Sequence, residues 1–549
     1  MATTAKDIKQ KHKQLQDIRV ARESTWEDII DFVLPGLESI YLLSQEERGK
    51  RIGTRRYDGT GVSALQLFAD GLFGYLISPS IAWLQLVMKE DLMQIPEIRS
   101  WLQAVEEHFY MVFNQTNFYD SMSTLFEYTP ALGFGDIYSE ENLKEQKIVF
   151  SVFHPGGIYV EENQFGIVDT VFRDLKISAQ NAVQKFGTDR VSKDLSMQTT
   201  TENGNPFKEY EFIHAVFPRN EANKVDIRAE NKPFASVWVQ KEGDPEDPNG
   251  RIVKESGFDL NPHNVWRYKK GTTAYGFGPG EDALMEIMGA NEIKKSLLKA
   301  AQKSVEPALN VPSEMQGMVD NGPNGMNYFT KPDRVISAVR TGVDFPVGID
   351  REERIQRAIE RHFKVEYFTL LSNLAAQAGV SRTATEVIEM AGEKAAVLGR
   401  PINRLNNEVL NPIIDRIFGI ELKAGRLPPM PQVLKDMEGE AIEVNYRGPL
   451  AQAQKKAFQV QGISQAIAQI APLAQIKPEI LDIINGDATV REILEATGFP
   501  QKAINDNTKV ENIRTARAKV LAEEEQKEGL ERLAATSKTF AEAEQVSAG

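Results

Sequence analysis

The sequence contains no cysteine in its 549 residues. This absence excludes disulfide bonds, thiolate catalysis, and zinc or iron–sulfur sites built on cysteine ligands. Basic residues are also in the minority, because 64 lysines and arginines against 78 aspartates and glutamates give a formal net charge of −14. Proteins that hold nucleic acid over a large surface use a basic excess to neutralise phosphate. We therefore expect no tight grip on DNA or RNA, although an acidic balance suits a surface past which nucleic acid slides.

Long apolar runs are scarce as well. The most apolar segment, residues 62–88, contains Asp70, several glycines and Pro79, whereas a membrane helix needs about 20 nearly continuous apolar residues. It predicts a buried helix followed by a strand, and we expect no membrane partner. The first residues lack the apolar core of a signal peptide. With 41% hydrophobic residues, the chain is long enough for about two to four packed units.

Signatures of catalysis are missing. The sequence has no G-x-x-x-x-G-K-[ST] loop for nucleotide hydrolysis. The segment YGFGPG (275–280) lacks the G-x-G-x-x-G spacing of a dinucleotide site, and Pro279 stands where a phosphate loop would offer an amide, so a tight turn and helix start are expected. The six histidines lie at no metal-ligand spacing, and the acidic residues 244–249 miss the calcium pattern. We expect no cofactor and no metal.

Hydrophobic periodicity predicts an N-terminal helical region and then a β-rich unit. The helices are expected over 5–33, 61–77 and 96–113, with a strand over the segment AWLQLVM (82–88). The β-rich unit covers 136–270, with one hairpin around 163–166, a second joining 234–241 to 251–258, and a short helix near 178–187.

Beyond residue 280 the pattern becomes helical again. Two long helices, 281–305 and 350–371, flank a Gly/Pro-rich stretch with β character over 307–349, which predicts a finger-like projection. A capping box, Thr383 with Glu386, opens a further helix to about Ile417 that Pro401 should kink. A strand is expected over 440–450, followed by helices over 450–470, 477–484, 489–496 and 508–534.

Two stripes of basic residues lie on the long helices. Lys295, Lys299 and Lys303 recur every fourth residue on the first helix, and the second helix is predicted to carry Arg354, Arg357, Arg361 and Lys364 on one face. Most charge stripes are solvated helix faces. In an otherwise acidic protein they could instead edge a pore that carries a polyanion, with weak and screened attraction.

Several uncommon segments occur in one order along most of the chain. They are WEDIIDFVLPG (26–36), YDGTGVSALQLFADGLFGYLISPSIAWLQL (57–86), TNFYDSM (116–122), IVDTVFR (167–173), VFPRN (216–220), YGFGPG (275–280), TATEVIE (383–389) and RGPLAQAQK (447–455). Together they resemble the portal (head-to-tail connector) proteins of short-tailed, podovirus-type bacteriophages. The resemblance extends from about Arg19 to Arg517.

This resemblance implies a mixed α+β, helix-rich portal fold that assembles as a ring of about twelve copies around a central channel. It divides the chain as follows: wing, 1–280; first stem helix, 281–305; clip, 306–349; second stem helix, 350–371; channel loop, kinked helix and return to the wing, 372–449; helical crown, 450–535; disordered tail, 536–549.

The resemblance also implies a structural role without catalysis. The ring would occupy one capsid vertex of the virion, having assembled in the host cytoplasm, and would pass double-stranded viral DNA during packaging and ejection. Its implied partners are the terminase large subunit, head–tail adaptor or tail proteins, the major capsid protein, and scaffolding or internal core proteins. The implied channel-loop residues are Ser372, Asn373, Gln377, Ser381 and Arg382, and the implied clip docking residues are Met315, Met318, Asn321, Asn324 and Met326.

Two other classes of protein remain open from the residues alone. One is a tail-associated, cell-wall degrading hydrolase, because a catalytic carboxylate pair cannot be picked out among 78 acidic residues. The other is a scaffolding protein without a channel. The long kinked helix and the finger-like insert favour the portal, since a scaffold needs neither.

Overall fold

The computed structural model describes residues 4–44, 47–49, 56–219, 228–242, 250–322, 324–328, 335–339, 345–368, 398–435, 442–446, 485–496, 504–505 and 509–520. The chain divides into two compact units. The first comprises Met1–Trp83, Tyr110–Arg426 and Gly448–Gln454, and the second comprises Leu84–Phe109, Leu427–Arg447 and Lys455–Gly549. No helix among the described residues is both long and apolar enough to cross a membrane.

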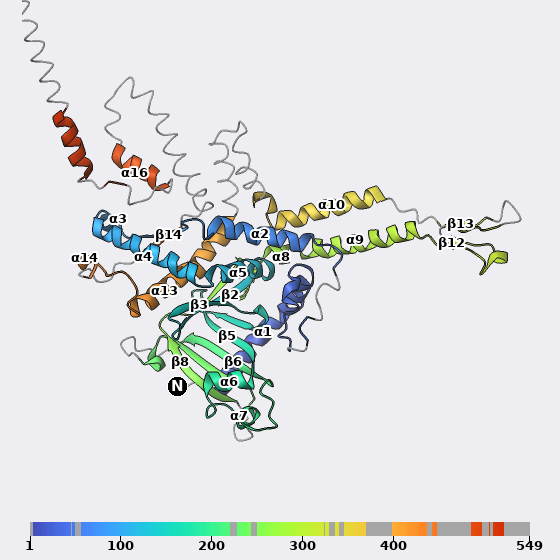
Figure 1. Cartoon of the computed structure of the whole chain (residues 1–549), viewed down its shortest axis with the longest axis horizontal. Helices are drawn as coiled ribbons and strands as arrows, with labels where there is room; N and C mark the ends of the chain where they lie inside the picture. Colours follow the sequence, from blue (N-terminus) through green and yellow to red (C-terminus); the bar gives the residue numbers. More distant parts are fainter. Residues whose placement is uncertain are drawn as a thin grey trace, which may run out of the picture. The chain divides into compact units, whose positions relative to one another are not determined.

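The first unit contains most of the secondary structure (Figure 1). Its helices are α1 (Ala5–Phe32), α2 (Thr60–Leu76), α5 (Phe118–Leu132), α6 (Ala179–Phe186), α7 (Lys193–Thr200), α8 (Pro279–Asp282), α9 (Leu284–Val305), α10 (Phe345–His362) and α13 (Asn411–Lys423). Helix α4 (Pro96–Gln115) begins in the second unit and ends in the first. The predicted helices 5–33, 61–77, 96–113 and 178–187 are confirmed to within a few residues, whereas α5 and α7 were not predicted.

The β-rich unit is confirmed as two antiparallel sheets. One has the order β3-β2-β9 and the other the order β4-β5-β6-β7-β8. Their strands are β2 (Phe134–Asn142), β3 (Lys147–Val152), β4 (Ile158–Glu162), β5 (Val168–Ser178), β6 (Glu209–Pro218), β7 (Phe234–Gln240), β8 (Arg251–Phe258) and β9 (His263–Arg267).

Both predicted hairpins are present in the five-stranded sheet. Strands β4 and β5 pair across a turn in which the Asn163 side chain accepts hydrogen bonds from the backbone of Phe165 and Ile167. Gly166 completes that turn with φ of 74°, a left-handed conformation that glycine adopts without steric cost. Strands β7 and β8 form the second hairpin.

Alternation along the strands determines which helix covers which face of this sheet. Val237 and Val239 of β7 pack in one cluster with Leu15 of α1. Trp238, which points to the opposite face, packs in a second cluster with Phe186 of α6 and with α7. Helix α1 therefore covers one face, and α6 with α7 covers the other.

A buried ionic contact fixes α1 on its face of the sheet. His12 Nε2 lies 2.9 Å from Asp174 Oδ1, and Lys241 Nζ lies 3.1 Å from Asp174 Oδ2. Burial alone would raise the pKa of Asp174, but the hydrogen bonds and charges of His12 and Lys241 outweigh it and hold that pKa below its ordinary value. The carboxylate therefore stabilises the fold when it is ionised.

Helix α5 joins the three-stranded sheet to the rest of the unit. Asn117, in the TNFYDSM segment, pairs with the edge strand β3 through both amide atoms, donating to the Phe150 carbonyl at 2.6 Å and accepting from its N–H at 3.0 Å. The ring of Phe118 then packs edge-on against Phe150 at 5.2 Å. At the other end of α5, Gly133 closes the helix in the left-handed conformation.

The three glycines of YGFGPG pack against that end of α5. Gly276, Gly278 and Gly280 alternate along the segment, and a Cβ on each would lie 2.3–2.4 Å from a backbone oxygen of residues 130–133. No side chain fits at such distances, so the glycine spacing is explained by backbone packing. The expected turn and helix start are confirmed, because Pro279 occupies the first turn of α8.

An ion pair connects α1 to this same turn. Arg22 Nη2 donates to both carboxylate oxygens of Glu281 at 2.6 and 2.7 Å, and its guanidinium lies 4.1 Å from the centre of the Phe277 ring. Burial raises the pKa of Glu281, and Arg22 opposes that rise without cancelling it. The residues that precede α9 are therefore tied to both α1 and α5.

The kink expected at Pro401 stays a prediction, since only three residues directly before it are described. Residues 398–405 are helical, including Pro401, and the helix widens into a π-helical turn, η5 (Asn406–Leu410), before α13. Pro412 follows at the start of α13, and because it has no N–H it cannot bond to Glu408 four residues back. The helix also runs to Lys423 rather than to about Ile417. Residues 383–397 lie outside the described residues.

The second unit holds a short two-stranded sheet and several helices. Strand β1 (Leu84–Val87) pairs antiparallel with β14 (Glu443–Tyr446), which confirms both predicted strands. Helices α3 (Glu90–Met93), α14 (Gln432–Lys435) and α16 (Gly486–Ala496) also belong to it, as do the helical residues 509–520. Of the predicted C-terminal helices, 489–496 and part of 508–534 are confirmed; 450–470, 477–484 and the tail 536–549 lie outside the described residues.

We predict that Gly278→Ala lowers the free energy of unfolding by about 1 to 3 kcal/mol, because the new methyl group must displace backbone atoms of α5. Gly289→Ala is the matched control, since a Cβ there meets nothing within 4 Å and alanine is the better helix former by about 1 kcal/mol. Thermal unfolding of the two variants checks this. Equal melting temperatures would contradict the packing explanation.

We also predict that Asp174→Asn destabilises the protein by about 1 to 3 kcal/mol at neutral pH. Because the native pKa of Asp174 is depressed, its contribution is present above the unfolded value of about 3.9 and is lost as pH falls through the native value. The gap between wild type and variant should shrink below about pH 4. Urea unfolding from acid to neutral pH measures it, and a gap that widens on acidification would refute the assignment.

Candidate functional site

Helices α9 and α10 form an antiparallel pair, called here the helical pair (Figure 1). Lys294 Nζ lies 2.5 Å from Glu352 Oε1, and the Leu297 side chain fills the space over Gly348. Nearer the other end, His362 Nε2 lies 3.7 Å from Glu286. These contacts confirm the predicted pair of long helices.

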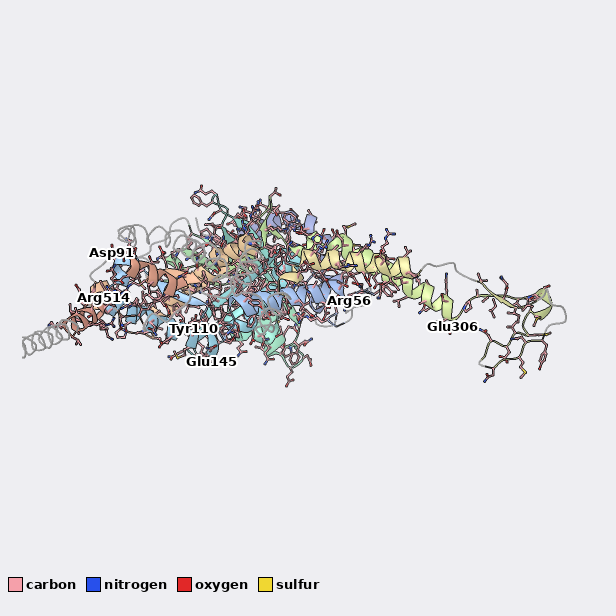
Figure 2. All side chains as sticks on the ribbon, turned by 90° about the horizontal axis from the view of Figure 1, so that it is seen from above. Arg56, Asp91, Tyr110, Glu145, Glu306 and Arg514 are labelled. Atoms are coloured by element: carbon pink, nitrogen blue, oxygen red, sulfur yellow. The ribbon has the colours of Figure 1, made fainter. Side chains whose placement is uncertain are left out.

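A two-stranded tip continues from the far end of the helical pair. Strand β12 (Leu309–Asn310) pairs with β13 (Ser337–Ala338), and Figure 2 shows Glu306 where α9 leads into this tip. The predicted projection is thus present, with β character in its insert. Helix α10 begins at Phe345 rather than at 350, because Pro346 favours a first helical turn.

The base of the helical pair is bound by the segment that precedes α2. Asn291 Oδ1 of α9 accepts hydrogen bonds from the backbone N–H groups of Tyr57 and Asp58 at 2.6 and 3.3 Å. Gln356 of α10 donates to Asp58 Oδ2 at 3.0 Å. Tyr57 and Asp58, the first residues of the segment 57–86, therefore hold both helices on one side. Figure 2 shows the neighbouring Arg56 beside this base.

Lys295, Lys299 and Lys303 form the lysine stripe, which points away from α10. Helical residues advance by about 100° each, so Lys299 lies roughly 140° around α9 from Lys294, which contacts α10. Lys299 and Lys303 are exposed, and neither has an ion-pair partner among the described residues. Lys295 is one-third exposed and lies 3.4 Å from Glu292.

Arg354, Arg357 and Arg361 form the arginine stripe, which points away from α9. By the same count, Arg357 lies roughly 140° around α10 from Glu352 and about 180° from Gly348. The three side chains are 60–73% exposed and pair loosely with acidic neighbours at 3.0–3.9 Å. Such exposed pairs are worth about 0–1 kcal/mol each, so the arginines keep most of their capacity to attract an anion.

The two stripes therefore lie on opposite sides of the helical pair. A single copy can turn only one of them towards a given surface, whether that surface is a pore wall or a partner. The sequence predicts both stripes but not this opposition, because periodicity gives each helix a face without saying where the other helix lies.

One residue was wrongly included in the second stripe. Lys364 lies beyond the end of α10, with φ of 56°, and its N–H bonds to the Arg361 carbonyl. Phe363, Val365 and Phe368, on either side of this turn, are all buried. No glycine marks this turn, so the sequence predicted an uninterrupted helix.

The clip docking candidates lie on the tip. Met318 and Met326 are 77% and 74% exposed, Asn321 and Asn324 are exposed, and Met315 is half-buried. A reciprocal pair of hydrogen bonds between Asn327 and the Asp320 backbone closes the loop that carries Asn321, Asn324 and Met326. The channel-loop candidates Ser372, Asn373, Gln377, Ser381 and Arg382 lie outside the described residues.

Exposed apolar residues of the helical pair and tip were missed by the sequence analysis. They include Leu298, Val305, Tyr328, Val347 and Ile349, which are 46–82% exposed. In the sequence these are apolar residues that lie outside the buried face of each helix. They can be identified as exposed only when that buried face is known.

The described residues supply no metal cluster, and the pocket beside α1 holds no catalytic pair. No group of three histidine, cysteine or acidic residues lies close enough to bind a metal ion among the described residues. A pocket of about 180 Å³ lies beside α1, where Arg19, Asp174 and Lys241 line it. Lys241 donates a hydrogen bond to Asp174, and Arg19 donates to Glu23 and to the carbonyl of residue 156. The pocket holds no nucleophile paired with a base.

Comparisons with known proteins agree with these observations. A family model described as "Bacteriophage head to tail connecting protein" matches residues 5–504. The chain belongs to this family. The portal protein of Salmonella phage epsilon15 is 29% identical over 94% of this chain and 92% of its own length, and the probable portal protein of Bordetella phage BPP-1 is 26% identical over 92% and 89%.

Solved structures also show a likeness. A chain in the structure titled "Neck of native GTA particle computed with C12 symmetry" is 12% identical and covers 75% of this chain and 86% of its own, with a TM-score of 0.30. One in "Virion of native gene transfer agent (GTA) particle" has 11% identity over the same shares and a TM-score of 0.31. Scores this low do not establish a common arrangement, so family membership rests on the sequence matches.

Proposed function

We propose that the chain is the portal protein of a short-tailed bacteriophage. Copies of it would close into a ring at one capsid vertex, at the junction of head and tail. The observation that carries this proposal is the match of the head-to-tail connecting family to residues 5–504. It is supported by the relatives named portal protein, which align over about nine-tenths of both chains.

The mechanism we propose is geometric rather than catalytic. About a dozen copies would surround a channel through which double-stranded DNA enters during packaging and leaves during ejection. A chain with net charge −14 would bind that DNA weakly. A single basic stripe per copy, repeated around the ring, adds screened attraction that guides a polyanion without holding it.

We further propose partners for the two ends of the ring. The tip, as the clip, would meet the terminase large subunit during packaging and adaptor or tail proteins afterwards. Its exposed methionines favour this role, because methionine adapts to more than one partner. The major capsid protein and scaffolding or internal core proteins would surround the remainder, and assembly would take place in the host cytoplasm.

The helical pair would be the stem, residues 1–280 the wing, and residues 450–535 the crown. This division is supported by α9 and α10 alone, since they are the antiparallel helices that carry the β tip. Ser372, Asn373, Gln377, Ser381 and Arg382 keep their proposed place in a channel loop on the resemblance only.

Native mass measurement of the purified chain tests the proposed assembly. We predict one dominant species at about twelve times the 61.5 kDa chain mass, with an axial hole in negative-stain images. A solution of isolated single copies at cellular concentrations would overturn the proposed function, whatever other activity they had.

The opposition of the two stripes yields a prediction about DNA. Alanine replacement of the whole lysine stripe and of the whole arginine stripe should have different effects, because only one can face the channel. We predict that one variant lowers the yield of genome-filled particles about twofold or more, while the other matches wild type and both still form rings. Equal effects of the two variants, or no effect of either, would rule out a one-sided electrostatic lining.

A further inference from the structure

A row of side chains crosses the face of the five-stranded sheet that α6 covers. Arg173 of β5 lies opposite His214 of β6, His214 opposite Trp238 of β7, and Trp238 opposite Lys254 of β8. Residues paired in this way point to the same face, so these side chains are neighbours from strand to strand. His214 is neutral, because burial first and then neighbouring cationic groups hold its pKa well below its ordinary value. The row therefore has a cation at each end and no charge between them.

A third cation lies over the middle of the row. Lys185 of α6 places Nζ 3.9 Å from the centre of the Trp238 ring, and the Arg173 guanidinium lies 5.5 Å from the same centre. Loss of hydration and then the charge of Arg173 lower the pKa of Lys185. Glu140 opposes this shift, and Lys254 adds to it. The three positive charges therefore gather around one indole ring.

None of the three cations has an ion-pair partner among the described residues, and Arg173 Nε is buried there without a hydrogen-bond acceptor. Two carboxylates, Asp136 and Glu140, act on Arg173 from beyond ion-pairing distance. Both are engaged elsewhere, since Glu140 accepts a hydrogen bond from Tyr138 Oη at 3.2 Å and Asp136 lies 2.7 Å from His263 Nδ1. Like charges gathered in this way repel one another.

The arrangement favours a compact anion of more than one charge. Cations from α6, β5 and β8 meet at one place, whereas the basic stripes of the helical pair follow the length of a helix. Phosphate offers several acceptor oxygens, which the planar fork of arginine and the ammonium group of lysine bind well. A nucleic-acid strand needs cations spaced along its backbone. Here the exposed Glu140 lies near the cluster, on a chain whose net charge is −14.

We propose that Arg173, Lys185 and Lys254 bind a small phosphate-bearing anion beside Trp238, at a place called here the phosphate site. The anion relieves the repulsion among the three cations and ties α6 to β5 and β8. The site lies within one chain, so this inference does not depend on the proposed ring.

The rate of acetylation of individual lysines tests the phosphate site. Only the neutral amine reacts, and a bound anion favours the charged form of Lys185. Native protein is acetylated in phosphate or in chloride of equal ionic strength, and peptide mass spectrometry gives the rate at each lysine. We expect about 10 mM inorganic phosphate to slow the reaction at Lys185 and Lys254 about threefold or more. Lys299 and Lys303, which are exposed, are internal controls whose rates should not change.

Two variants assign the effect to the site. Arg173→Gln and Lys254→Gln each remove one cation of the cluster, and each should reduce the protection of Lys185 by phosphate. Lys299→Gln removes one charge elsewhere and should leave that protection unchanged. Circular dichroism checks the fold of every variant. Lys254 is only half-buried, so its variant still decides the question if Arg173→Gln does not fold.

Equal slowing at the control lysines, or protection of Lys185 that survives both variants, would overturn the proposal. Duplex DNA at the same phosphate concentration and a polyglutamate peptide serve as further probes. Protection by either of them without protection by inorganic phosphate means that the cluster binds a macromolecule, which also overturns it. None of these results concerns the number of copies that assemble, so a failure here leaves the proposed function standing.

Discussion

The close approach of two backbones at the base of the helical pair is the constraint on which the rest of the first unit depends. Gly276, Gly278 and Gly280 leave no room for a side chain between themselves and residues 130–133, so the chain entering α8 and α9 can take only one path past α5. The Arg22–Glu281 ion pair adds a link from that turn to α1. A projection of two helices can act as a rigid part of an assembly only if its base is held in this way, from several elements at once.

The distribution of charge then determines what the projection can do. Both outward sides of the helical pair are basic, on a chain whose net charge is −14. The arginine side extends to Val347, because Arg354 follows Val347 by seven residues on α10. In the proposed ring, a basic stripe on the wall would attract a polyanion weakly, so that the polyanion could move rather than bind tightly.

Much of this architecture could be predicted from the sequence, because helices α1, α2, α4 and α9 have a strong 3.6-residue periodicity and the β hairpins are bounded by turn residues. Other parts could not. Helix α5 contains Pro130, the turn at Lys364 has no glycine to mark it, and the widening at η5 comes from Pro412 rather than from the more conspicuous Pro401. The burial of Phe363, Val365 and Phe368 around Lys364 is a tertiary effect, whereas the widening at η5 has a local cause in Pro412. The stripes were visible as patterns, but their opposite orientation depends on which residues meet across the pair.

The most direct test of this account is a cryo-electron microscopy map of the assembled protein in which side chains of α9 and α10 are resolved. The account predicts a closed ring with an axial opening and one basic stripe of every copy on its wall. A map without an opening, or one in which neither basic stripe lies on its wall, would contradict it.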